Sequence, residues 1–199
     1  MECRTDAELM ELVRRRDFAA FDELYDRYSG LLRRFLFSLT WDQDTTEDYL
    51  QEVFVRLYLA RDRYVPSGKL SNYLFRIAKN YYLSQCRKTN GRQEVSLSHE
   101  DRNGFRPFER IRANERIEPE VHLMEEYRRW QMRQAIRSLP EKQKLVFVMS
   151  HFEEMRYEQI AEVLGVPVGT VKSRMFAAVQ NLRAALTVGA KDSDDVPCA

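Results

Sequence analysis

The segment from residue 157 to residue 176 constrains the fold of this chain more than any other part of the sequence. It reads YEQIAEVLGVPVGTVKSRMF, in which one short apolar run ends at a glycine and another begins after a proline. Gly165 can end a helix because glycine adopts a positive φ angle at low cost, and Ala161 is small enough to lie where two helices cross. Pro167 cannot continue a helix, so a new one has to begin after it. The segment therefore predicts two helices joined by a tight turn.

The second of these helices has an outward face suited to nucleic acid. Val171 and Met175 are expected to face the core. The side chains left outside are Thr170, Lys172, Ser173 and Arg174. Such side chains contact phosphates and base edges, and no acidic residue lies between Val163 and Ala190 to repel a phosphate. The pattern is typical of a DNA-binding helix-turn-helix, and a helical hairpin used only for packing is the alternative.

Composition limits the class of protein. The chain has 199 residues, of which 44% are hydrophobic, so it can bury a core. Its formal net charge is only +1, so total charge does not identify a nucleic-acid partner. The N-terminus opens with charged residues, and apolar runs such as residues 145–149 are far too short to cross a bilayer. We expect a cytoplasmic protein without membrane insertion.

No group of residues in the sequence suggests catalysis or metal binding. The cysteines are Cys3, Cys86 and Cys198, an odd number without CxxC spacing. The histidines are His99, His122 and His151, which lie far apart in the sequence. We therefore expect reduced thiols, no metal, no cofactor and no enzymatic activity.

Helical periodicity runs through residues 1–90. Two capping signatures, Thr5 with Glu8 and Asp44 with Glu47, would begin the first and third helices. In the second helix, aromatic and leucine residues recur every three or four positions, as in a helix that faces a core. A Pro-Ser-Gly sequence then forces a turn before a fourth helix.

The periodicity stops over residues 91–120, where glycines, prolines and charges of both signs are mixed, so this stretch predicts a flexible linker. It returns over residues 121–188, which include the helix-turn-helix, and residues 189–199 form an acidic tail. We therefore predict an all-α fold of two small helical domains joined by a flexible linker, with the helix-turn-helix in the C-terminal domain.

A second candidate nucleic-acid surface lies on the fourth helix. Residues 63–93 contain no Asp or Glu, but many Lys and Arg residues with tyrosines among them. Tyr73, Arg76 and Asn80 share the face opposite the apolar one, and Lys79 lies beside them. Cations would follow the backbone of a single strand while rings stack on its bases. A solvated basic face with tyrosines half buried for packing is the alternative.

The third helix presents an acidic face just upstream of this surface. Asp48, Gln51 and Glu52 lie on one side of the helix, where they could dock on a basic partner. An ordinary solvated helix face explains these residues equally well.

Three phrases of the sequence, in this order, resemble bacterial sigma factors of the compact extracytoplasmic-function type, and the likeness covers nearly the whole chain. The family helix that grips the clamp of the RNA polymerase beta-prime subunit is similar to residues 44–58, DTTEDYLQEVFVRLY. The family segment that opens the promoter near minus ten is similar to residues 69–88, KLSNYLFRIAKNYYLSQCRK. The family domain that meets the minus-35 element is similar to residues 139–176.

The resemblance implies a sigma factor that binds core RNA polymerase, at the beta-prime clamp and the beta flap, and directs initiation on double- and single-stranded promoter DNA. It implies that the minus-ten strand is bound by Tyr73, Arg76, Lys79, Asn80, Arg87 and Lys88. It implies that the minus-35 duplex is bound by Thr170, Lys172, Ser173, Arg174 and Phe176. It implies that core polymerase is bound by Asp48, Gln51 and Glu52.

Some positions depart from the family pattern. Tyr73 stands where tryptophan is common, Glu154 where the family usually turns on glycine, and Ala177 where a basic residue supports the recognition helix. We therefore expect the upstream element to be bound weakly or to have an unusual sequence.

The alternatives left open by the sequence belong to other classes. A stand-alone helix-turn-helix regulator would dimerise on a palindromic site without polymerase. A helical adaptor would have no nucleic-acid function. An enzyme is a more distant alternative. An anti-sigma factor is a candidate partner because compact family members are often held inactive by one, but no residue here decides the matter.

Overall fold

A computed structural model describes residues 4–66, 68–90 and 119–191, and within these ranges every regular element is a helix. The helices of the N-terminal half are α1 (Asp6–Arg14), α2 (Phe18–Thr40), α3 (Gln43–Ala60) and α4 (Leu70–Asn90). Those of the C-terminal half are α5 (Pro119–Arg137), α6 (Glu141–His151), α7 (Tyr157–Leu164) and α8 (Val168–Lys191). The predicted all-α fold of two helical domains is confirmed. The predicted linker, residues 91–120, falls almost wholly outside the described residues.

Side-chain caps fix where the first three helices begin. Thr5 and Glu8 form the predicted capping box of α1, with the Glu8 amide donating to Thr5 Oγ1 at 3.3 Å. The predicted box of α3 is wrong by two residues. Asp42 is the N-cap, because its backbone is extended and its carboxylate accepts from the Thr45 amide at 2.8 Å. Asp44 instead lies in the first turn, where a carboxylate is favoured by the helix dipole.

The N-terminal half is built around α2, α3 and α4, whose apolar faces meet. Phe35 of α2 is fully buried and packs edge-on against Phe75 of α4 with ring centroids 5.0 Å apart. Leu50, Val53 and Leu57 of α3 are fully buried, as their spacing predicted. Burial of each such side chain stabilises the fold by roughly 1.5–3 kcal/mol.

The C-terminal half has its own small apolar cluster. Its buried members are Ala135, Ile136, Leu139, Ala178 and Leu182, from the end of α5, the following turn and α8. Pro140 is the N-cap of α6, one position before the first helical turn. Helix α8 continues to Lys191, so the first residues of the predicted acidic tail are helical and the rest lie outside the described residues.

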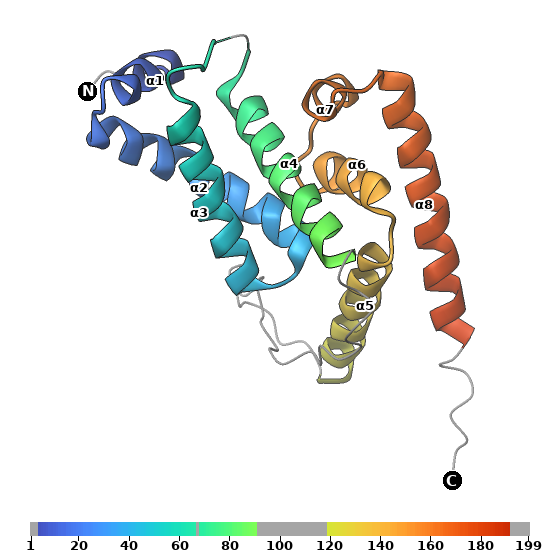
Figure 1. Cartoon of the computed structure of the whole chain (residues 1–199). Coiled ribbons are helices and arrows are strands. Elements are labelled where there is room, and N and C mark those ends of the chain that lie inside the picture. The colour runs from blue at the N-terminus through green and yellow to red at the C-terminus, as the bar shows by residue number, and fades with distance from the viewer. Residues whose placement is uncertain (1–3, 67, 91–118, 192–199) are drawn as a thin grey trace.

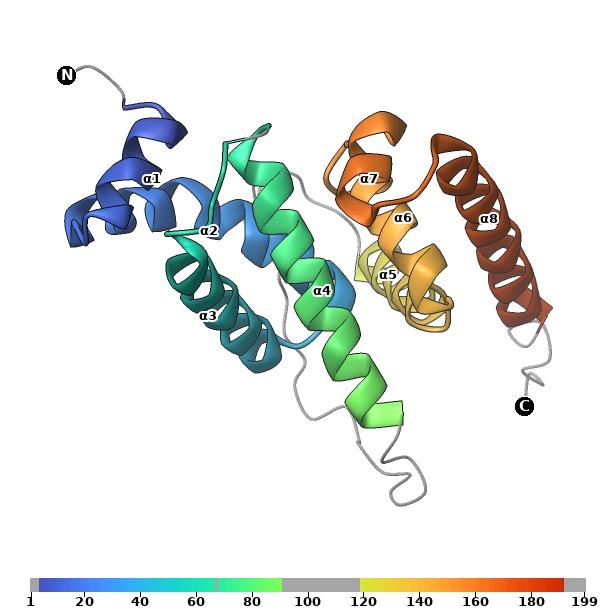
Figure 2. The ribbon, with the colours of Figure 1, turned by 45° about the horizontal axis from the view of Figure 1, so that its top comes forward.

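The two halves contact each other along α4. In Figures 1 and 2, α4 lies between the α1–α3 group and the pair α6 and α7, while α8 lies on the far side of that pair. Helix α4 packs on α7 and α2 packs on α6. One apolar cluster accordingly includes Leu74 of α4 together with Val148 of α6 and Ile160 of α7. The sequence did not predict that the halves share a core.

Among the described helices, none combines the length and the apolar character that a membrane span requires.

Candidate nucleic-acid interface

The helix-turn-helix has the predicted geometry. Gly165 ends α7 with a φ angle of 69°, and its amide donates to the Ala161 carbonyl at 2.8 Å. The carbonyl of Pro167 accepts from the Thr170 amide at 2.9 Å, which begins α8 directly after the turn. Val171 is fully buried, so α8 is fixed to the rest of the domain by this side chain.

The outward face of α8 carries the residues expected to meet a duplex. Lys172 and Ser173 are exposed, and Phe176 is 68% exposed. Thr170 and Arg174 are partly buried at the edge of the same face. The structure therefore brings the five predicted residues to the outward side of one helix, with Lys172, Ser173 and Phe176 the most exposed.

The outward face of α4 holds the other predicted set. Arg76, Asn80, Arg87 and Lys88 are exposed. Tyr73 is half-buried and lies against Tyr64, with ring centroids 5.1 Å apart. Lys79 is half-buried, and desolvation together with the nearby Arg76 charge lowers the pKa of its ammonium group.

Part of this α4 face is in contact with α7. The amide Nδ2 of Asn72 donates to Glu162 Oε2 at 2.9 Å, and Arg76 Nη2 lies 4.0 Å from Glu162 Oε1. Lys79 Nζ donates to the carbonyl of Val163 at 3.4 Å. A small cleft of about 20 Å³ remains beside these contacts, lined by Tyr73 and Glu162 among others.

Sequence reasoning missed Asn72 and Glu162. Asn72 is 6% exposed although it is polar, and no periodic signal marks it as a contact residue. Glu162 is the last carboxylate before a long acid-free stretch, which is the one feature of the sequence that distinguishes it. The contact joins residues 90 positions apart, so local patterns cannot reveal it.

The acidic face of α3 is accessible. Asp48 and Gln51 are exposed, and Glu52 accepts from Arg56 Nε at 2.7 Å. The Arg56 guanidinium in turn lies over the Tyr81 ring, 4.8 Å from its centroid. The three residues predicted to contact polymerase therefore share one side of α3, and Glu52 forms an ion pair with Arg56.

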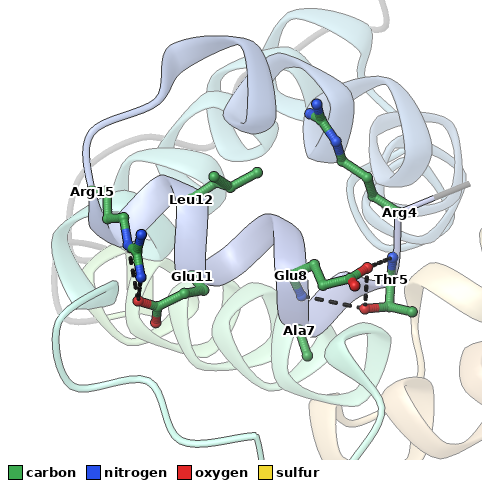
Figure 3. A pocket seen from close by; sticks show the side chains of 7 residues that line it. All are labelled: Arg4, Thr5, Ala7, Glu8, Glu11, Leu12 and Arg15. Atoms are coloured by element: carbon green, nitrogen blue, oxygen red, sulfur yellow. Dashed lines mark hydrogen bonds and ion pairs between the residues drawn. The ribbon is translucent and has the colours of Figure 1, made fainter.

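Two other features bear on catalysis and ligand binding. The described residues contain no group of His, Cys, Asp and Glu side chains placed to hold a metal ion. An open hollow of about 930 Å³ lies along α1 (Figure 3). Most of its polar side chains are engaged with one another, Glu8 with Thr5 and Glu11 with Arg15, and Arg4 pairs with Glu23. Nothing in the hollow points to a ligand.

Fold and motif together define an all-helical DNA-binding protein. Comparisons with known proteins assign its family. Residues 24–92 match the family described as Sigma-70 region 2, and residues 129–182 match Sigma-70, region 4. The chain is 31% identical over 183 residues to the ECF RNA polymerase sigma-E factor of Escherichia coli K12, covering 87% of this chain and 90% of that relative. It is 28% identical over 171 residues to the ECF RNA polymerase sigma factor SigW of Bacillus subtilis, covering 86% and 91%. The chain belongs to the ECF RNA polymerase sigma factors.

Solved structures support the same fold. The chain superposes on CnrH, solved in complex with the cytosolic domain of CnrY, with a TM-score of 0.62 and 22% identity over 90% of this chain and 96% of that one. It superposes on the sigma factor RpoE of Bartonella quintana, solved with the anti-sigma factor NepR, with a TM-score of 0.60 and 22% identity over 84% and 97%.

Membership of this family decides between the classes that the sequence left open. The protein is a sigma factor that directs promoter-specific transcription, with core RNA polymerase and promoter DNA as its partners. A stand-alone regulator is not favoured, because the N-terminal half matches a sigma region of its own rather than a sensing domain.

Proposed function

We propose that the two predicted DNA surfaces of this sigma factor divide the promoter between them. Helix α8 reads the minus-35 duplex, and α4 binds the unpaired minus-ten strand. The observation that carries this division is that each surface lies within a different sigma region, with exposed cations on both: Lys172 on α8 and Arg76 on α4.

On α8, the proposed contacts follow from the chemistry of the exposed side chains. Lys172 and Arg174 supply charge for phosphates, and Ser173 supplies a hydroxyl for a phosphate or a base edge. Thr170 lies at the N-terminal end of the helix, where a phosphate is also favoured by the helix dipole. Phe176 is exposed and apolar, which suits contact with a thymine methyl group.

On α4, a base taken out of the stack needs a surface that accepts a ring and its polar edge. Unpairing and unstacking cost a few kcal/mol, and capture of the free base offsets that cost. Tyr73 offers a ring, Asn80 an amide, and Arg76 and Lys79 charge for the adjacent backbone. Arg87 and Lys88, in the last turn of α4, would follow the strand further along.

Core polymerase would be held through α3, where Asp48, Gln51 and Glu52 meet a basic surface of the clamp. We further propose that residues 1–90 and 121–188 act as the two functional domains, in the cytoplasm and without catalysis of their own. The sigma factor RpoE of Bartonella quintana was solved bound to the anti-sigma factor NepR, which supports the proposal that this chain too has an anti-sigma partner.

Run-off transcription tests the proposal directly. Purified core polymerase is combined with a genomic promoter library, with and without the full-length chain. We expect new start points only when the chain is present. A polymerase that neither retains the chain nor initiates at new positions would overturn the proposed function.

A further inference from the structure

Helix α5 carries two exposed aromatic rings that belong neither to the two DNA surfaces nor to the acidic face of α3. Tyr127 and Trp130 are 44% and 48% exposed. Their ring centroids lie 6.0 Å apart with 20° between the ring planes, so the rings form a nearly parallel pair. A pair of large aromatic side chains left in water is a candidate for ligand contact.

The rings face outward because the opposite side of α5 is packed in the C-terminal half. Ala135 and Ile136 of α5 are buried in one cluster with Ala178 and Leu182 of α8. With 3.6 residues in each helical turn, Trp130 lies on the other side of α5 from these residues. The pair is therefore carried by a helix that is already fixed by its own apolar contacts.

The same stretch of α5 is strongly basic. Residues 127–140 contain no Asp or Glu. They contain four arginines, Arg128, Arg129, Arg133 and Arg137. Arg133 and Arg137 follow Trp130 by three and seven positions, which places both on the side of the rings. This face is therefore complementary to a polyanion that also carries flat apolar groups.

A single strand of nucleic acid fits this face better than a duplex or a protein does. In a duplex the bases stack on one another, so only their edges can be reached. In a single strand the base faces are open, and aromatic and guanidinium planes stack on them. Tyrosine, tryptophan and arginine are also common at protein interfaces. The centre of a protein interface is poor in charge, however, whereas arginines flank these rings.

We propose that Tyr127, Trp130, Arg133 and Arg137 form a binding site for single-stranded RNA. The protein directs transcription, so the polymerase that it binds makes an RNA strand. The unpaired promoter strand has its own proposed site on α4, in the other sigma region. The role of α4 only decides between RNA and DNA, and the α5 site goes beyond the functions proposed for α4 and α8.

Trp130 can report on its own occupancy. A full-length chain carrying Trp41→Phe keeps Trp130 as its only tryptophan, since the sequence has two. A base that stacks on the indole quenches its emission, so quenching counts only the strands bound at α5. The probe is a pool of short single-stranded RNA of random sequence. A DNA pool of the same length and a poly-glutamate peptide are titrated in the same way.

Two substitutions on α5 are compared in this single-tryptophan chain. Tyr127→Ala removes the neighbouring ring, and Met132→Ala removes an exposed apolar side chain of the same helix that has no ring. We expect Tyr127→Ala to weaken RNA binding by about five- to 150-fold, which corresponds to the loss of one stacked base. Met132→Ala should bind RNA as the parent does. Circular dichroism checks that all three chains keep their helix content.

The salt dependence of quenching tests the two arginines. Each phosphate contact on a single strand contributes about 0.7 to the slope of log affinity against log salt. Arg133→Gln together with Arg137→Gln should therefore lower the slope for RNA by about 1.4. The matched control is Arg15→Gln with Arg16→Gln, two exposed arginines at the end of α1, which should leave the slope unchanged.

The outcomes separate the RNA site from its rivals. RNA that quenches Trp130 at lower concentrations than DNA supports the proposal, and equal quenching by DNA overturns the assignment to RNA. Quenching by poly-glutamate but not by RNA would instead make this face a docking site for an acidic protein. If nothing quenches Trp130, or if Tyr127→Ala equals Met132→Ala, the site does not exist. The run-off test of the proposed function is separate from all of these results, because they do not measure α4 or α8.

Discussion

The two helices proposed to bind DNA differ in what surrounds them. Lys172 and Ser173 of α8 are exposed. Helix α8 itself lies on the side of the C-terminal half away from α4 (Figure 2). Helix α4 has Arg76 and Lys79 engaged by α7. Both helices carry exposed cations, but part of the α4 face is in contact with α7. The helix-turn-helix domain therefore has two faces: an exposed face with Lys172, which is proposed to bind duplex DNA, and a face with Glu162 that contacts α4.

The largest expected effect separates strand capture from duplex contact. Tyr73→Ala should lower promoter opening by about five- to 150-fold, because loss of one stacked base costs ~1–3 kcal/mol. The upstream footprint of the polymerase complex should be retained. Permanganate reactivity of unpaired thymines measures opening, and DNase protection measures the footprint. Asn80→Ala, which removes an exposed amide without removing the Tyr73–Tyr64 contact, should act in the same direction. Equal loss of both signals in either variant would contradict the division between α4 and α8.

The next effect tests the third predicted surface, the acidic face of α3. Replacing Asp48 and Glu52 together by Lys should weaken binding to core polymerase by about tenfold or more, since like charges placed against each other cost several kcal/mol. Pull-down with purified core polymerase measures the loss. The matched control replaces Asp22 and Asp26, which are exposed on α2, by Lys. Recovery as low in the control as in the α3 variant would remove the docking role.

A smaller effect compares α4 with α8 in the free chain. Each phosphate contact contributes about 0.9 to the slope of log affinity against log salt. Lys172→Ala should therefore reduce the salt slope of duplex binding by about one, because Lys172 is open. Arg76→Ala should leave the salt slope of single-strand binding nearly unchanged, because Arg76 already faces Glu162. Fluorescence anisotropy over a salt series gives both slopes, and equal reductions would show that α4 is not covered.

The smallest effect concerns the turn between α6 and α7, which contains Glu154. Glu154 has a φ angle of 52°, a left-handed conformation that costs a non-glycine residue roughly 1–2 kcal/mol. Glu154→Gly should raise the melting temperature by about 2–4 °C for each kcal/mol recovered. Gly165→Ala should instead lower the melting temperature. The φ angle of 69° is costly for alanine, and the added Cβ would meet no atom within 4 Å that could compensate. Calorimetry of both variants checks the signs, and a lower melting temperature for Glu154→Gly would contradict the expectation.

Sequence reasoning succeeded where the cause of structure is local. Gly165 and Val171 determined the helix-turn-helix because a positive φ angle and a buried β-branched residue have few alternatives. The capping box at Thr5 was predicted for the same reason. The start of α3 was wrong by two residues because Asp42 and Asp44 have the same capping chemistry and only the backbone decides between them. Family resemblance supplied what periodicity could not, the assignment of each basic helix to a part of the promoter.

The contact between the two halves could not be predicted from the sequence. Asn72 reaches Glu162 across a distance of 90 positions, and neither residue stands out in a helical pattern. Lys79 was predicted to face a DNA strand. In the structure it is half-buried and donates to the Val163 carbonyl, because an ammonium group can donate to a protein oxygen as well as to a phosphate. Such a contact depends on complementary surfaces that meet only in the folded chain, and a short stretch of sequence does not show them.

The most direct test of the account is the separation of the two halves with and without polymerase. Spin labels are attached at Asp62→Cys and Glu158→Cys, both exposed positions, in a chain whose native cysteines are replaced by serine. Double electron–electron resonance then measures the distance between the labels. We predict one short distance in the free chain and a longer one when core polymerase is added. The same distance in both samples, or a long distance already in the free chain, would contradict a covered α4 that polymerase uncovers.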